Sequence, residues 1–151
     1  MKPMTKEKVP KKAFVQGAIS ANFIGESIAK HSNKDNIGAH SIFLGQVRAD
    51  EKVGGKVVSI FYEAYEEMAE KKIHEIREDA FAKFDLICMH IYHSLGTVNT
   101  GEMSLFIFTS SAHRLAAAEA CSYIVERIKA EVQVWGKEIL DTGSIKWKEN
   151  T

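Results

Sequence analysis

The sequence predicts one α+β domain, in which helices pack over an antiparallel or mixed β-sheet. Segments rich in β-branched and aromatic residues alternate along the chain with segments whose apolar residues recur at helical spacing. Most of the expected strands are joined by short turns, which connect antiparallel neighbours. With 151 residues, of which 45% are hydrophobic and 26% charged, the chain has the size and composition of one globular domain.

The first expected elements follow a basic stretch. Residues 1–12 carry several lysines and no apolar run, so we expect a disordered basic tail followed by a single domain over residues 13–151. Residues 13–20 predict a strand. Residues 21–32 predict a short helix, for which Ser20 is the expected N-cap.

Two strands and a charged helix are predicted next. Residues 39–47 and 56–65 are rich in β-branched and aromatic side chains, and the charged, glycine-containing stretch 48–55 predicts a mobile loop between them. Over residues 66–84 a helix is predicted from one apolar stripe on an otherwise charged segment. The residues of this stripe are Ala69, Ile73, Ile76, Ala80 and Phe84.

The C-terminal half predicts a hairpin, a helix and a last strand. Residues 86–96 and 102–111 are the expected strands of the hairpin. A helix is expected from about 113 to 133, with Gly136 as its C-cap, and residues 144–149 predict a short final strand. The residues expected to be buried on this helix are Leu115, Ala118, Cys121, Val125, Ile128 and Val132.

Charge and cysteine content exclude several classes of function. Twenty basic side chains balance twenty acidic ones, whereas broad nucleic-acid or membrane binding needs a large positive field. No apolar run approaches the roughly 18 residues of a membrane span. Cys88 and Cys121 lie far apart and form no metal-ligand motif, so we expect two buried thiols in a cytoplasmic protein with no metal site.

The segment TSSAHR (109–114) is a candidate anion site. A helix N-terminus presents unpaired N–H groups and the positive end of the helix dipole, and His113 and Arg114 add cationic side chains there. The alternative is that both side chains point into solvent or that Arg114 pairs with a distant acid. Arg48 ends a strand beside the expected loop, which is a common ligand position, although an ordinary surface arginine fits the same pattern.

Two lysines near the end of the last helix are the other candidates. Lys129 lies among apolar neighbours, so its stem can be buried while its amine reaches a pocket; a solvated helix face is the alternative. Lys137 follows Gly136, and a lysine near a helix C-terminus also suits the dipole for purely structural reasons.

The order and spacing of these motifs resemble the large, catalytic subunit of molybdopterin synthase. The matching segments are GQVR (45–48), HSLGTVNTGE (93–102), TSSAHR (109–114), RIKAEV (127–132) and Trp135 with Lys137 and Glu138 just beyond it. Together they extend the resemblance over roughly residues 13–148. It implies an α/β hammerhead fold with a small antiparallel β extension, assembled as a homodimer.

The resemblance also implies a reaction and partners. It implies a sulfurtransferase that converts a cyclic pyranopterin monophosphate into molybdopterin by adding two sulfurs. The sulfur arrives as a thiocarboxylate on the C-terminal Gly-Gly tail of a small ubiquitin-like partner, and two partners on one dimer form a heterotetramer. No metal or organic cofactor is implied.

The resemblance assigns roles to residues of this chain. It implies Lys129 as the main catalytic lysine, and the residues implied to bind substrate are Gln46, Arg48, His113, Arg114 and Glu138. The family usually has lysine directly after the tryptophan, where this chain has Gly136. We therefore expect Lys137 to act as the second catalytic lysine, brought into place by a turn at Gly136.

Further departures from the family pattern keep alternatives open. Gln46 and Ser94 stand where the family often has lysine and arginine, so the expected pocket is less cationic. One alternative is a non-catalytic or weakly active scaffold that binds the ubiquitin-like partner, and another is a small-molecule-binding α+β regulatory domain. Because Arg114 and Lys129 lie about 22 Å apart along a straight helix, we expect the two ends to serve different pockets. In a two-fold dimer, His113 and Arg114 of one protomer would then meet Lys129 of the other.

Overall fold

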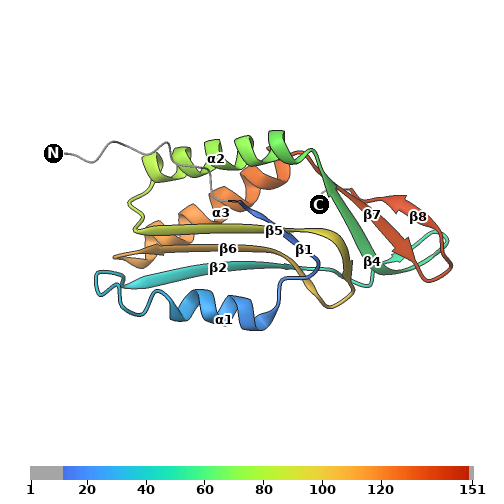
Figure 1. The fold of residues 1–151 in the computed structure, drawn as a ribbon, viewed down its shortest axis with the longest axis horizontal. Helices are drawn as coiled ribbons and strands as arrows, with labels where there is room; N and C mark the ends of the chain where they lie inside the picture. The colour runs from blue at the N-terminus through green and yellow to red at the C-terminus, as the bar shows by residue number, and fades with distance from the viewer. Residues whose placement is uncertain (1–11, 150–151) are drawn as a thin grey trace.

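The structure is a computed structural model that describes residues 12–149, so the predicted basic tail lies outside it except for Lys12. Figure 1 shows the elements along the chain. In order they are β1 (Phe14–Gln16), α1 (Ala21–Ala29), β2 (Ala39–Gln46), β3 (Glu51–Lys52), β4 (Gly55–Ala64), α2 (Glu66–Lys83), β5 (Cys88–Asn99), β6 (Met103–Ser111), α3 (Arg114–Glu131), β7 (Val134–Leu140) and β8 (Ile145–Trp147).

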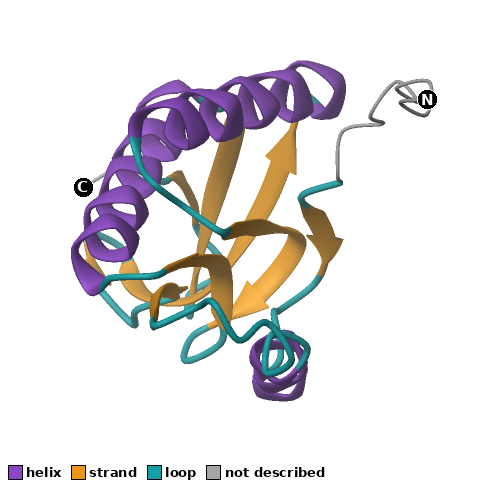
Figure 2. Cartoon of the chain, turned by 90° about the vertical axis from the view of Figure 1, so that its left-hand side faces the viewer, coloured by secondary structure: helices purple, strands orange, loops and turns teal. Residues whose placement is uncertain are grey.

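The strands form one sheet, and this confirms the predicted α+β class. The order across the sheet is β2-β6-β5-β4-β7-β8, with β1 added beside β5 and β3 beside β4. The β1–β5 pair is parallel and the other pairs are antiparallel. Helices α2 and α3 cover one face of the β2-β6-β5 region and α1 lies on the other face (Figure 2), while β4, β7 and β8 extend beyond it (Figure 1).

Strand β6 is the centre of the domain because helices cover it on both faces. Leu105 and Ile107 belong to the core formed with α2 and α3. Phe106 and Phe108 point the other way and pack in the core under α1. A third core, which includes Val57, joins β4 and β7 to the far end of β5. Burial on both faces explains why β6 is a continuous apolar run.

The first two helices agree with the sequence prediction. The Ser20 hydroxyl accepts a hydrogen bond from the Phe23 N–H at 3.1 Å, so Ser20 is the N-cap of α1. In α2 the buried residues are Ala69, Ile73, Ile76 and Ala80, which are four of the five predicted positions.

The buried face of helix α3 agrees in part with the predicted one, since Cys121, Val125 and Ile128 are buried as predicted. Leu115 is 66% exposed and Ala118 is also exposed, so burial of these two residues was predicted wrongly. The buried residues are Ala117, Ala120, Cys121, Ile124, Val125 and Ile128. Two hydroxyls of the preceding strand fix the start of the helix: the Ser111 Oγ accepts from the Ala117 N–H at 3.0 Å, and the Thr109 Oγ1 donates to the Ala117 carbonyl at 2.7 Å.

The segment after α3 is a strand, which the sequence did not predict. The helix ends with Val132 as its C-cap, and Gly136 lies within β7, opposite Tyr62 of β4. The prediction that Gly136 caps the helix was therefore wrong. Val134 and Trp135 have strong strand preference, and pairing with β4 satisfies their backbone groups.

The expected loop at 48–55 also contains regular structure. Glu51 and Lys52 form β3, which pairs with the start of β4. The glycines Gly54 and Gly55 have φ angles of +98° and +141°, values that favour glycine and allow this tight hairpin.

Both cysteine thiols are unbridged and buried, as predicted. Within residues 12–149 no helix is long and apolar enough to cross a membrane.

Candidate active site

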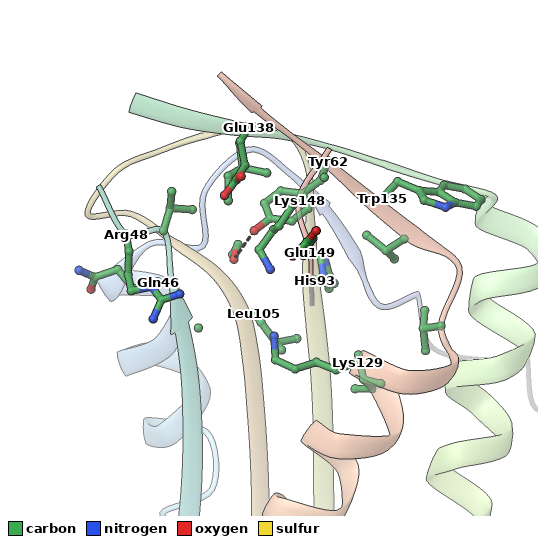
Figure 3. A pocket seen from close by; sticks show the side chains of 18 of the residues that line it. Gln46, Arg48, Tyr62, His93, Leu105, Lys129, Trp135, Glu138, Lys148 and Glu149 are labelled. Atoms are coloured by element: carbon green, nitrogen blue, oxygen red, sulfur yellow. Dashed lines mark hydrogen bonds between the residues drawn. The ribbon is translucent and has the colours of Figure 1, made fainter. Parts of the chain in front are cut away.

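A pocket of about 980 Å³ lies where the end of α3 faces the sheet extension (Figure 3). Its walls come from the ends of β2 and α3, from β4 and β7, and from the segment after β8. The cationic lining residues are Arg48, Lys52, Lys129 and Lys148, and the acidic ones are Asp50, Glu131, Glu138 and Glu149. The pocket therefore gathers four of the predicted site residues, namely Gln46, Arg48, Lys129 and Glu138.

Lys129 reaches the pocket from the last turn of α3. Its neighbour Ile128 is buried in the helix core, so the backbone of this turn is held in place. In Figure 3 the Lys129 side chain runs from the helix end past Leu105 into the pocket. The predicted main catalytic lysine thus lines a cavity that is open to a ligand.

Gln46 and Arg48 enter from the opposite wall. Gln46 is the last residue of β2, and Arg48 follows two residues later. The Arg48 guanidinium contacts the Asp50 carboxylate at 3.3 Å, but its side chain is 73% exposed. An exposed pair of this kind is weak, so the guanidinium remains available to an anionic ligand.

Glu138 is the buried carboxylate of the pocket. It is 6% exposed and lies on β7, and its Oε1 atom is 3.6 Å from the Lys52 Nζ. Lys52 belongs to β3, so the unpredicted β3–β4 hairpin supplies the partner of a predicted site residue.

His93 was not predicted as a site residue, but it lines the pocket. Its Nδ1 lies 2.8 Å from the Ser94 carbonyl oxygen, which can only accept a hydrogen bond. Nδ1 therefore carries the proton of the neutral ring, and Nε2 carries a lone pair. The pKa of His93 is lowered to about 4, and burial is the largest cause. The positive charges of Lys129 and Lys148 also lower it, whereas the hydrogen bond to the Ser94 carbonyl raises it. At neutral pH His93 is consequently uncharged.

Lys148 is the second pocket residue that the sequence reasoning missed. It follows β8, is partly buried, and lines the pocket together with Lys129. Burial lowers the pKa of Lys148, with further lowering from Lys129, Arg48 and Lys52, whereas Glu138 raises it. The signal for it was the final strand at 144–149: antiparallel pairing with residues 134–140 would have placed Lys148 opposite Gly136.

Lys137 is not in the pocket. It lies on β7 between Gly136 and Glu138, and alternation along a strand directs its side chain to the other face. There its Nζ lies 2.9 Å from the Glu63 carboxylate and 5.3 Å from the centre of the Trp147 ring. The late turn at Gly136 that was expected to bring Lys137 into place does not occur, because this segment is a regular strand.

His113 and Arg114 lie at the other end of α3 from Lys129, and both are exposed. At about 1.5 Å per residue the 15 residues between Arg114 and Lys129 span about 22 Å. His113 and Arg114 therefore do not line the pocket of their own chain, and the expectation that the two ends of the helix serve different pockets stays a prediction.

Among residues 12–149 no group of three or more His, Cys, Asp or Glu side chains is arranged to hold a metal ion. The chemistry available from the pocket side chains is that of amines, a guanidinium, a neutral imidazole and carboxylates. Such a set can bind anions and transfer protons.

Comparison with known proteins identifies relatives of this chain. The family model described as MoaE protein matches residues 19–131. A protein of Pyrococcus abyssi named molybdopterin synthase catalytic subunit is 41% identical over 126 residues, which is 83% of each chain. A protein of the same name from cattle is 43% identical over 113 residues, which cover 75% of this chain but 59% of the longer cattle protein. The chain likewise spans 58% of the length of its rice relative.

Solved structures agree with this relationship. Molybdopterin synthase from Staphylococcus aureus superposes with a TM-score of 0.79 at 33% identity, covering 91% of this chain and 96% of the other. One subunit of a complex of subunits 1 and 2 of the molybdopterin-converting factor from Helicobacter pylori shares the fold, with a TM-score of 0.76, 19% identity and coverage of 90% and 88%. From the family match over residues 19–131 and from the identity to these relatives, we conclude that the chain belongs to the MoaE protein family.

Proposed function

We propose that this chain is the catalytic subunit of a molybdopterin synthase. In this reaction sulfur passes from the C-terminal thiocarboxylate of a small ubiquitin-like protein to a cyclic pyranopterin monophosphate, and the product is the molybdopterin dithiolene. The observation that carries the proposal is the position of Lys129. Its amine enters an open pocket that also contains Arg48 and Glu138, in a chain whose relatives bear the name of this enzyme.

The size and charge of the pocket support a phosphorylated pterin as substrate. A volume of about 980 Å³ lies at the upper end of the usual range for small-molecule sites, so it has room for a pterin and the end of a peptide tail. The guanidinium of Arg48 suits a phosphate, since charge-assisted hydrogen bonds to its oxygens are strong. Gln46 beside it offers an amide that can donate to the same oxygens or to the pterin ring.

A second protein subunit is part of the proposal, since relatives called a catalytic subunit imply another subunit. The rim of the pocket supports this. Trp135 and Trp147 lie at the edge of the cavity, on the Lys137 face of β7 and β8, and are 50% and 63% exposed. Such accessible aromatic rings are enriched at protein interfaces. We place the Gly-Gly tail of the ubiquitin-like partner across this rim, with its end directed toward Lys129.

The roles of the pocket residues follow from the chemistry. In each transfer a carbon–sulfur bond of the partner thiocarboxylate breaks, a carbon–sulfur bond to the pterin side chain forms, and the same side-chain carbon loses a carbon–oxygen bond. Water supplies the oxygen with which the partner leaves as a carboxylate, and two partners deliver the two sulfurs. The Lys129 amine acts as base or nucleophile in this exchange, and Glu138, held by Lys52, orients the cationic groups around it.

The proposal includes a homodimer that binds two partner subunits as a heterotetramer in the cytoplasm. His113 and Arg114 are exposed at the start of α3, far from the pocket of their own chain. We propose that they reach the pocket of the second protomer and add to its phosphate-binding groups. The two unbridged cysteines agree with a reducing compartment.

Reconstitution tests the proposed function. The chain is mixed with cyclic pyranopterin monophosphate and with a thiocarboxylated ubiquitin-like protein, and the pterin products are measured by mass spectrometry. Incorporation of two sulfur atoms, with return of the partner as a carboxylate, is expected. Binding of the partner without any sulfur incorporation would instead support the non-catalytic scaffold.

A further inference from the structure

Backbone pairing fixes Lys148 beside β7. The Lys148 N–H donates to the Gly136 carbonyl at 2.8 Å, one step beyond the Lys137–Trp147 pair of the β7–β8 ladder. Directly opposed residues of antiparallel strands present their side chains on the same face. Lys148 therefore shares the face of Gly136 and Glu138, which is the face that lines the pocket.

The absence of a side chain at Gly136 makes room for the Lys148 stem. A Cβ atom at position 136 would lie 3.4 Å from the Lys148 Cβ and 3.3 Å from its Cδ. It would also lie 2.9 Å from the Ile60 Cγ2, which is closer than real Cβ contacts. The lysine stem thus lies across the glycine. In Figure 3 the Lys148 side chain points into the pocket, and its amine is drawn between Glu138 and His93.

Several cationic side chains lie near Lys148. Burial is the largest cause that lowers the pKa of Lys148. The positive charges of Lys129, Arg48 and Lys52 lower it further. Glu138 opposes them, but its carboxylate already pairs with Lys52. An anionic ligand placed beside Lys148 would be stabilised by this amine and by its cationic neighbours.

We propose that Lys148 is a second substrate-facing amine of the pocket and that, together with Lys129, it binds an anionic group of the substrate. The inference rests on the proposed function for the identity of that substrate. The anion is either the phosphate of the pterin or the carboxylate-like end of the partner tail, since both carry charged oxygens. Lys148, rather than Lys137, then supplies the second amine of a chain that has glycine after its tryptophan.

Anion binding by the full chain tests the proposal without catalysis. Inorganic phosphate in one arm, and a peptide ending in Gly-Gly in the other, are titrated into the protein by calorimetry. Lys148→Met is expected to weaken binding by about 10-fold or more in at least one arm, as for the loss of a charge-assisted hydrogen bond. The arm that weakens identifies the anion.

The control is Lys71→Met, because Lys71 lies on α2 with a side chain that is 76% exposed and is outside the lining of the pocket. It should leave binding unchanged within about 2-fold, since a distant surface charge is screened by salt. Equal weakening in both variants would show a general effect of surface charge and would overturn the assignment.

Two further measurements separate a pocket role from a structural one. Nuclear magnetic resonance titration of His93 should show its pKa rising in Lys148→Met, because one of the two cations that lower it is removed. Gly136→Ala retains the lysine but displaces its stem, so it should weaken anion binding as Lys148→Met does. The double variant should be no weaker than either single one. An unchanged His93 pKa would contradict the placement of the amine.

Failure of this inference differs from failure of the proposed function. If the wild-type chain transfers sulfur and Lys148→Met does so at the same rate with the same anion affinity, the inference is wrong and the function stands. If the wild-type chain transfers no sulfur, but Lys148→Met binds the anion more weakly than the wild-type chain does, the Lys148 site stands and the proposed function is wrong.

Discussion

The ammonium group of Lys137 lies 2.9 Å from the Glu63 carboxylate, across the β4–β7 ladder and outside the pocket. It also lies over the Trp147 ring. Lys137 therefore connects β7 to β4 through Glu63 and to β8 through Trp147. Lys137, which we expected to replace the family's lysine at position 136, thus has a structural explanation.

Lys137→Ala decides between these two roles. Because the side chain lies outside the pocket, we expect sulfur transfer to stay within about 2-fold of wild-type. Since the contact is partly exposed, the free energy of unfolding should fall by less than about 1 kcal/mol. Activity assays and urea unfolding measure the two effects. A loss of transfer on the order of 10²-fold, as expected for a positioned acid–base group, would support the expected catalytic role of Lys137 instead.

Lys129→Ala should abolish sulfur transfer while the ubiquitin-like partner still binds. The variant removes the amine from the pocket but leaves the rim tryptophans in place. We expect a fall of at least about 10²-fold in transfer and little change in partner affinity. Single-turnover assays and calorimetry measure these quantities. Lys129→Arg is the matched control, since it keeps the charge but removes the amine chemistry, and it should also be inactive.

Arg114→Ala and Lys129→Ala should complement each other in a mixed dimer. Arg114 and Lys129 lie at opposite ends of α3, so we expect each pocket to combine Lys129 of one protomer with His113 and Arg114 of the other. After mixing and reassociation, one pocket per mixed dimer regains both groups. Transfer activity should rise well above that of either variant alone. Sites confined to single chains would give no recovery.

His93 should make stability depend on acidity. Its pKa in the folded chain, about 4, is below the ordinary value of 6.5, so the unfolded chain binds the proton more readily. The stability that the neutral ring contributes is fully present above about pH 6.5 and is lost as the pH falls toward 4. Urea unfolding from pH 4 to 7 measures the slope. His93→Gln should flatten this slope, whereas His74→Gln, at a half-exposed position of α2, should leave the slope in place.

Phe108→Ala should strongly destabilise the domain without touching the pocket. Phe108 is fully buried under α1, where its ring lies 6.0 Å from Phe106 and 4.9 Å from His31. Removing a buried phenyl ring leaves a cavity and costs about 3–5 kcal/mol. Thermal or urea unfolding measures this loss. Leu115→Ala is the control, because Leu115 is 66% exposed and its loss should cost less than about 0.5 kcal/mol.

The sequence predicted the elements whose signals are local. The stripe of α2 and the Ser20 cap depend on neighbours in the chain, and both were correct. Strands β3 and β7 were not predicted, because their structure depends on pairing with β4. The same reason separates the two lysines of the site. Lys129 sits at a recognisable helix end, whereas Lys148 reaches the pocket through an antiparallel partner that only the fold supplies.

Strand β5 belongs to both parts of the sheet, and this sharing has a consequence for folding. Residues Cys88 to His93 pair with β6, and Gly96 to Asn99 pair with β4. A slip of one residue along β5 would reverse its faces in both parts at once, turning Ile91 out of the helix-covered core and Val98 out of the extension. Neither part can therefore settle its strand register independently of the other. The domain is expected to unfold as one cooperative unit, and the pocket between its two parts should form in the same transition that completes the sheet.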